Sequence, residues 1–300
     1  MKYTFKQFQT EYPDDAACLD KIMERRYGGT VLTCPACGVS EAKFHRITKR
    51  RAYACQDCGH HIYPCVGTPF EKSRTPLTSW FFAMYLMTTT RHGVAAKELE
   101  RQLGVTYKTA WRIAHELRKH MANSDNTGPL SGHVEMDETF VGGKRRGRRS
   151  MGKGANPLAN KAVVFGMLER GGALRAGPVP DANKETLLPY ILTNVQRGSV
   201  INTDEAAAYK TLETAGPYTH FAVNHSAYEY VAGIHHTNSI EGFWGHFKKG
   251  IKGTNVGVSK KHLWKYVAEY TYRYNFRDLG TYGLFNRLVW TFQQPRLVEP

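Results

Sequence analysis

The chain has 300 residues, and 41% of them are hydrophobic. That length suits one large domain with one or two small modules, and the composition excludes a disordered chain. Lys and Arg number 41 against 26 Asp and Glu, which gives a formal charge of +15. This excess predicts a polyanionic partner, nucleic acid before an anionic membrane, although a basic protein without such a partner is the plain alternative.

The start of the chain, MKYTFKQFQTEY, lacks the apolar core of a signal peptide. The longest apolar run, from Trp80 to Met87, is too short to span a bilayer. We therefore expect a cytosolic protein that does not engage a membrane. In a reducing compartment, the six cysteines indicate metal binding or free thiols rather than disulfides.

The first part of the chain, residues 1–70, combines a helix with a metal site. ACLDKIMERRYG predicts a packing helix that ends at Gly28 and Gly29, and two C-x-x-C-G motifs follow it. Each motif forms a tight turn that directs two thiolates at one centre. Together they predict a closed, structural Zn²⁺ site, with disulfides as the alternative. Its ligands are Cys34, Cys37, Cys55 and Cys58.

Between the two motifs, FHRITKRRAYAC predicts a strand pair, so a zinc ribbon fits better than a helical finger. A closed Cys₄ site has no open position, and any catalysis must lie elsewhere. The basic residues on the intervening loop either contact phosphates or form a solvated face; they are Arg46, Lys49, Arg50 and Arg51. Cys18 and Cys65 are expected to be packed thiols.

Residues 71–122 predict a helical DNA-binding region. Thr75 and Pro76 can start a helix, as cap and first-turn residue. Two helices joined by a turn at Gly104, the second capped by Thr106, are predicted by AAKELERQLGVTYKTAWRIAHELRKHM. This is the pattern of a helix-turn-helix, and an ordinary helical hairpin shares it. The buried positions on the second helix would be Trp111, Ile113 and Leu117. The side chains that would face a DNA major groove are Tyr107, Lys108, Arg112 and, as a further candidate, His115.

A polar linker, residues 123–131, separates this region from a second domain at residues 132–300. That domain opens with HVEMDETFVGG, whose alternation predicts a strand with Val134, Met136 and Phe140 on one face. Glu135, Asp137 and Thr139 would lie on the other face. The basic, glycine-rich segment that follows either contacts DNA or is a solvated loop; its candidate DNA ligands are Lys144, Arg145, Arg146, Arg148 and Arg149.

Further along, KAVVFGMLER and ALRAGPVP predict a hairpin, and ANKETLLPYILTNVQ predicts a helix kinked near Pro189. Its apolar stripe would be core: Leu187, Leu188, Ile191, Leu192 and Val195. A strand ending in Asp204, a short helix, the strand THFAVNH and a final helix complete the domain. The overall fold class is therefore multidomain α+β, with a ribonuclease-H-like domain, a mixed sheet with flanking helices, as its last part.

Three carboxylates from two strands and the last helix can converge on hard cations such as Mg²⁺: Asp137, Asp204 and Glu241. Lys248 lies seven residues after Glu241, on the same helical face, where it could contact phosphate. The alternatives are a capping box between Asn238 and Glu241, and a merely solvated Lys248. Glu138 and Glu205 adjoin the two aspartates and are the alternatives to them; the strand pleat places Glu138 on the Met136 face and so favours Asp137, whereas Glu205, just past its strand, stays an alternative to Asp204. Three nearby histidines could bind metal but are expected instead to contact DNA or cap the helix, because carboxylates suit Mg²⁺ better than imidazoles do; they are His225, His235 and His236.

The sequence resembles insertion-sequence DDE transposases with an N-terminal zinc ribbon, the ISXO-like family. The motifs that carry the resemblance occur in order over nearly the whole chain. The resembling motifs are CPACG and CQDCG, GVAAKELERQLGVTYKTAWR, VEMDETFVGGK, INTDEAAAY and HHTNSIEGFWGHFKKGI. The resemblance implies that Asp137, Asp204 and Glu241 are catalytic and bind two Mg²⁺ or Mn²⁺ ions, with Lys248 as a downstream basic residue.

The same resemblance implies a prokaryotic, cytoplasmic and nucleoid-associated enzyme that cuts and joins double-stranded DNA. Its partners would be the inverted repeats of the element and a target DNA, with Lys248 and Lys249 among the DNA contacts and at least a dimer on paired ends. Two other functions fit parts of the sequence: a DNA-binding regulator without catalysis, and a ribonuclease-H-like nuclease without strand transfer.

Overall fold

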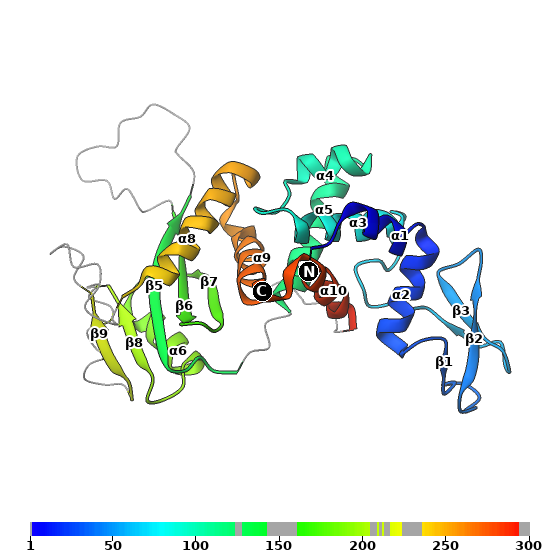
Figure 1. Ribbon diagram of the computed structural model, residues 1–300, viewed down its shortest axis with the longest axis horizontal. Coiled ribbons are helices and arrows are strands. Elements are labelled where there is room, and N and C mark those ends of the chain that lie inside the picture. The colour runs from blue at the N-terminus through cyan, green and yellow to red at the C-terminus, as the bar shows by residue number, and fades with distance from the viewer. Residues whose placement is uncertain are drawn as a thin grey trace. The chain divides into compact units, whose positions relative to one another are not determined.

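The computed structural model describes residues 2–123, 128–142, 161–204, 209, 212, 217–223 and 236–293. The chain divides into two compact units (Figure 1). The first contains the residues up to Ser124 and those from Phe276 onward, and the second runs from Asp125 to Asn275. This division differs from the expected domain at residues 132–300.

The helix after Phe276 belongs to the first unit because of its aromatic contacts. The ring of Phe285, which is fully buried, lies 5.2 Å from that of Tyr3 and 6.2 Å from that of Phe81. The linker, which was expected at residues 123–131, ends before Leu130 in the structure. Leu130 is 1% exposed, and its N–H donates to the carbonyl of Asn194 within the second unit.

The first unit contains a small antiparallel sheet in the order β1-β2-β3-β4, followed and preceded by helices. Pairing of β2 with β3 confirms the strand pair predicted between the cysteine motifs. The elements are α1 (Phe5–Glu11), α2 (Asp15–Tyr27), β1 (Val31–Leu32), β2 (Ala42–Ile47), β3 (Ala52–Cys55), β4 (His61–Ile62), α3 (Leu77–Thr89), α4 (Ala96–Leu103), α5 (Tyr107–Ala122) and α10 (Gly280–Trp290).

The start of α3 differs from the prediction that Thr75 caps it. The capping position is Pro76, which makes no side-chain cap bond. Instead, the Asp15 carboxylate of α2 accepts hydrogen bonds from the N–H and the hydroxyl of Thr78, at 2.9 and 3.0 Å. The cap therefore comes from a residue distant in sequence, which satisfies first-turn donors of α3 and ties the two helices together.

The second unit is built on a mixed five-stranded sheet in the order β7-β6-β5-β8-β9. Antiparallel pairing joins β5 to β6 and β6 to β7, which confirms the predicted hairpin, and β8 pairs in parallel with β5 and β9. The elements are β5 (His133–Val141), β6 (Ala162–Glu169), β7 (Leu174–Val179), α6 (Lys184–Asn194), β8 (Val200–Thr203), β9 (Thr219–Ala222), α8 (Asn238–Gly250) and α9 (Leu263–Asn275).

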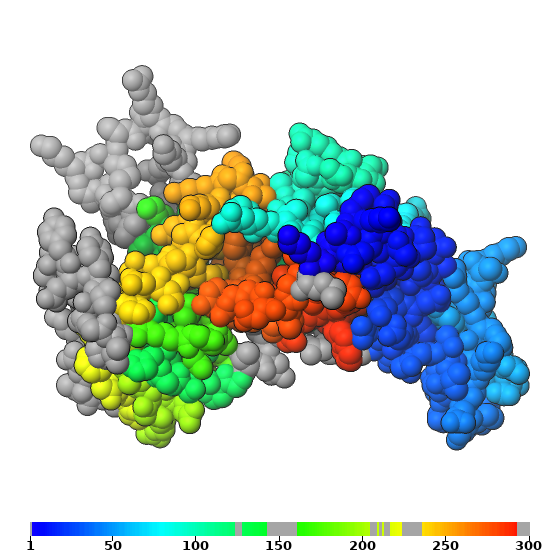
Figure 2. Space-filling model, in the orientation of Figure 1, coloured from blue at the N-terminus to red at the C-terminus, as the bar shows by residue number. Residues whose placement is uncertain are grey.

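Helices cover both faces of this sheet. On one face, α6 contributes Leu187 and Ile191 to a core with Val134 and Met136 of β5. Leu192, which was expected in the same stripe, is 51% exposed. On the other face, α8 and α9 pack over β6 and β7 through a second core, and Figure 1 shows α8 crossing the sheet. Figure 2 shows α8, in yellow and orange, covering green strands of the same unit.

The alternation predicted for β5 decides which side chains meet which helix. Val134 and Met136 face α6, whereas Glu135, which pairs with Leu168 of the other core, faces α8. Phe140, near the end of the strand, is 36% exposed rather than buried. Among the described helices, none is long and apolar enough to cross a membrane.

Candidate functional site

The four motif cysteines converge on one centre. Their sulfur atoms all lie within 4.8 Å of one another, and within the described residues no other group of three or more potential ligands meets that spacing. Gly38 and Gly59 end the two turns with φ of +72°, where a side chain would be strained. The N–H of Cys37 lowers the pKa of the Cys34 thiol to about 6. The site suits Zn²⁺, because Zn²⁺ binds cysteines in their thiolate form and these turns present four cysteines to one centre.

Other residues of the ribbon have structural contacts. Cys18 and Cys65 are 0% and 6% exposed and lie outside the cluster, and burial raises the pKa of Cys65 to about 11. The Arg51 guanidinium donates to the carbonyls of Ser73 and Thr75. It also contacts the carboxylate of Asp15. Arg51 is therefore neither a free phosphate ligand nor part of a solvated face.

The second unit brings the predicted carboxylates together. Asp137 lies on β5, Asp204 follows directly after β8, and Glu241 lies in the first turn of α8. The parallel pairing of β5 with β8 brings the strands of the two aspartates side by side. The carboxylates do not meet the 4.8 Å spacing of the cysteines, yet their charges act on one another.

Burial, followed by the negative charges of Glu138, Asp204 and Glu241, raises the pKa of Asp137 to about 7. A raised pKa means that ionised Asp137 is disfavoured among these neighbours. A cation bound between the carboxylates would reverse that preference, because it stabilises the ionised form. Oxygen ligands of this kind are those that Mg²⁺ and Mn²⁺ take in proteins, so the residues fit such an ion.

Glu138 is a fourth carboxylate near this cluster. It accepts a hydrogen bond from the hydroxyl of Tyr209, which lies in the core on the Met136 face of the sheet. Burial, with a further contribution from the charge of Asp204, raises the pKa of Glu138. Glu138 is thus oriented by the opposite core, as the strand pleat predicts, but remains within electrostatic reach of the aspartates.

The predicted face of α8 is confirmed. Ile240, Phe243, Phe247 and Ile251 are at most 8% exposed, and Trp244, which the sequence reading passed over, is buried beside them. Lys248 and Lys249 are exposed.

The capping box suggested for Asn238 and Glu241 is not formed. The capping position is Thr237, and its hydroxyl donates to Oε1 of Glu241 at 2.9 Å.

Sequence reasoning missed the role of Glu135. This residue is fully buried, and its carboxylate accepts hydrogen bonds from the N–H groups of Ser239 and Ile240, at 2.8 and 3.1 Å. Arg170 donates to the same carboxylate at 2.7 Å. The available signal was that Glu135 shares the Asp137 face of the strand, but its partners lie far away along the chain.

In the first unit, α4 and α5 are joined through Gly104, with φ of +63°, and Thr106 caps α5. Tyr107, Lys108 and Arg112 are exposed. Ile113 and Leu117 are buried as expected, whereas Trp111 is only partly buried. His115 is 3% exposed and stacks on Trp111 at 3.8 Å, so it does not present a surface ligand.

Several sequence candidates lie outside the described residues: Lys144, Arg145, Arg146, Arg148, Arg149, Glu205, His225 and His235. His236 is described, and its Nδ1 lies 3.2 Å from Oε1 of Glu135. His236 therefore contacts Glu135 of β5, which accepts hydrogen bonds from the start of α8.

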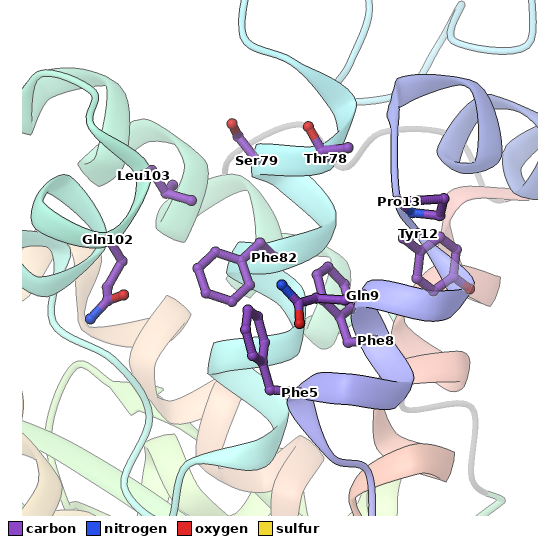
Figure 3. Close-up of a pocket in the computed structure, with 10 residues that line it drawn as sticks. All are labelled: Phe5, Phe8, Gln9, Tyr12, Pro13, Thr78, Ser79, Phe82, Gln102 and Leu103. Carbon is purple, nitrogen blue, oxygen red and sulfur yellow. The ribbon is translucent and has the colours of Figure 1, made fainter.

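A hollow in the first unit is distinct in character from both sites. Figure 3 shows Phe5 and Phe8 of α1 and Phe82 of α3 lining it, with Gln102 of α4 opposite. Its lining contains no acid, cysteine or histidine. It offers apolar contact rather than metal binding.

Comparison with known proteins gives three findings. Residues 129–275 match the ISXO2-like transposase domain, and residues 13–61 match the transposase zinc-ribbon domain. The chain is similar to an uncharacterized protein in transposable element ISH50 of Halobacterium salinarum, at 30% identity over 267 residues, covering 84% of this chain and 88% of that protein. A solved structure, the Mos1 transposase paired-end complex with left transposon end, aligns over 68% of this chain and 75% of that one, at 11% identity and a TM-score of 0.21.

Proposed function

This chain belongs to the ISXO2-like transposase family, and on that premise we propose that it binds the terminal inverted repeats of its insertion sequence, cuts the DNA there and joins the freed 3′-hydroxyl to a target. The observation that supports the proposal is that the charges of Asp204 and Glu241 help to raise the pKa of the buried Asp137. A buried acid whose pKa is raised by the charges of two neighbouring carboxylates is expected where a cation belongs.

Asp137, Asp204 and Glu241 would hold two Mg²⁺ or Mn²⁺ ions. When bound, such ions activate the attacking water or hydroxyl and neutralise charge on the phosphate. The chain itself would supply positioning, because β5 and β8 pack into one core of the second unit and α8 packs into the other. Lys248, exposed on α8 and two turns beyond Glu241, is suited to contact a DNA phosphate.

The sheet order β7-β6-β5-β8-β9, with three antiparallel strands followed by two parallel ones, supports a ribonuclease-H-like assignment for the second unit. In mixed sheets with helices on both faces, strand ends are the usual place for ligand sites. Asp204 follows its strand directly, which agrees with that rule.

DNA recognition is assigned to the first unit. The pair α4 and α5, with its Gly104 turn, supports a helix-turn-helix in which Tyr107, Lys108 and Arg112 face the major groove. The zinc ribbon next to it and the formal charge of +15 fit the same partner. Paired DNA ends would require at least a dimer.

The test is Mg²⁺- or Mn²⁺-dependent cleavage and joining of DNA that carries the inverted repeats flanking this gene. Asp137→Asn and Asp204→Asn should abolish both reactions and leave binding to the repeats intact. Glu185→Gln, which changes an exposed acid on α6, is the matched control and should react as the unaltered protein does.

Each contrary outcome identifies a different error. Full cleavage by either aspartate variant would mean that the metal site is wrong. Specific binding by the unaltered protein without cleavage or joining would support the regulator, and cleavage without joining would support a ribonuclease-H-like nuclease.

A further inference from the structure

The start of α8 is held by a residue from the sheet. Thr237, at the capping position, makes no side-chain cap bond, so the first N–H groups of the helix need another acceptor. The fully buried carboxylate of Glu135 supplies it, through the N–H groups of Ser239 and Ile240 and the Ser239 hydroxyl, at 2.8, 3.1 and 3.1 Å. A carboxylate at this end of a helix also interacts favourably with the helix dipole.

Arg170, just after β6, completes the arrangement. Its Nε donates to Glu135 at 2.7 Å, and its terminal nitrogen donates to the carbonyl of His236 at 2.6 Å. Its own N–H donates to the carbonyl of His133, at the start of β5. One guanidinium thus connects the strand pair to the residues that lead into α8, and its charge balances that of the buried acid.

The position of this contact gives it a functional consequence. Glu135 lies two residues before Asp137, on the same face of β5. Ile240, whose N–H it accepts, directly precedes Glu241. A rigid strand and one helical turn therefore connect Glu135 to both carboxylates, and the contact determines where Glu241 lies relative to Asp137.

We propose that Glu135, neutralised by Arg170, is a positioning residue that holds the first turn of α8 so that Glu241 and Asp137 can share a divalent cation. This inference rests on the proposed function, because it assumes a metal site at those carboxylates. Glu135 itself does not bind the ion, since its oxygens are occupied by the amides of α8 and by Arg170.

The deciding variant is Glu135→Gln in the zinc-loaded full-length chain. Glutamine keeps the shape of the side chain but replaces one of its two accepting oxygens with an NH₂ group. The N–H groups of α8 and the Arg170 guanidinium then share a single acceptor oxygen. We expect faster amide hydrogen exchange in the first turn of α8. We also expect the Mn²⁺ concentration for half-saturation, measured by electron paramagnetic resonance without DNA, to rise at least about tenfold. Cleavage should recover in part at high Mn²⁺.

Two controls separate positioning from general damage. Glu269→Gln removes another fully buried acid of the same unit, paired with Arg273 on α9 at 3.4 Å, and should leave Mn²⁺ binding unchanged. Ser239→Ala removes only the hydroxyl contact and should have a small effect. If Glu135→Gln does not fold, Arg170→Lys replaces it, because one ammonium cannot bridge Glu135 and the His236 carbonyl as the guanidinium does.

The outcomes distinguish this inference from the proposed function. If Asp137→Asn weakens Mn²⁺ binding but Glu135→Gln weakens it no more than Glu269→Gln does, the positioning role is wrong and the metal site stands. If Asp137→Asn binds Mn²⁺ as the unaltered protein does, the metal site is misplaced, and the positioning role falls with it.

Discussion

Asp137 and Gly166 face each other across the antiparallel ladder between β5 and β6. Paired residues point to the same face of a sheet, so the α8 face has an acid and, beside it, a position without a side chain. Trp244 of α8 uses that space, since a Cβ at Gly166 would lie 2.7 Å from its Cζ2. Helix α8 therefore rests directly on the strand pair that bears Asp137.

Replacement of Gly166 by alanine should displace α8. The added methyl group would overlap Trp244 and approach Ile240, and we expect a loss of about 1–3 kcal/mol in the free energy of unfolding, together with reduced cleavage. Urea denaturation and the cleavage assay measure the two effects. Gly177→Ala on β7 is the control, because a Cβ there meets nothing within 4 Å. Equal stability of the two variants would contradict this packing.

The raised pKa of Asp137 predicts a pH-dependent stability. Its pKa is about 7 in the folded chain against an ordinary 3.8, so between these values the folded state holds a proton that the unfolded state has lost. Stability should therefore fall as pH rises towards 7, and level off above it. Asp137→Asn removes this cost and should gain stability relative to the unaltered protein as pH rises.

Urea unfolding at pH 5, 6, 7 and 8, without added divalent ions, measures that difference. Asp181→Asn is the control, because the Thr186 hydroxyl and the Asn183 amide lower the pKa of Asp181 and keep it ionised throughout this range. Its effect on stability should be the same at each pH. A difference between Asp137→Asn and the unaltered protein that does not vary with pH would rule out the raised pKa.

Loss of one ribbon cysteine should release zinc. Cys37→Ser removes one of four converging ligands, and we expect less than one zinc per chain, local unfolding of the ribbon and weaker binding to the inverted repeats. Zinc content and footprinting are the measurements. Cys65→Ala, at a buried thiol outside the cluster, should retain zinc. Full zinc content in Cys37→Ser would exclude the four-cysteine site.

Lys108 provides a test of the DNA-binding role that we propose for α5. It is exposed on α5, whereas the Arg112 guanidinium also lies over the Trp80 ring at 5.5 Å, so its loss would disturb packing. Lys108→Ala should weaken DNA binding and reduce the slope of log affinity against log salt by about 1. Lys21→Ala on α2, a charge-matched control paired with Glu24, should leave the slope unchanged. An unaltered slope in Lys108→Ala would remove α5 from the interface.

Local patterns in the sequence determined much of this structure. Each C-x-x-C-G turn is a short-range structure that brings two thiols together, and the strand pair predicted between the motifs brings the two turns together. Alternation in β5 likewise predicted which of its side chains share a face, although both faces are covered, and the apolar spacing of α8 predicted its buried face. The same patterns placed Asp137, Asp204 and Glu241 on or beside two strands and a helix, where the structure has them, and their catalytic role stays a prediction.

Contacts between distant residues were decided only by the tertiary structure. Asp15 rather than Thr75 binds the start of α3, Glu135 rather than Asn238 holds the start of α8, and Gly166 admits Trp244. The helix after Phe276 joins the first unit instead of the second. No local propensity encodes these choices, because a carboxylate is an equally good acceptor for the N-terminus of any helix that the fold brings to it. Packing and strand register decide which helix lies next to which carboxylate.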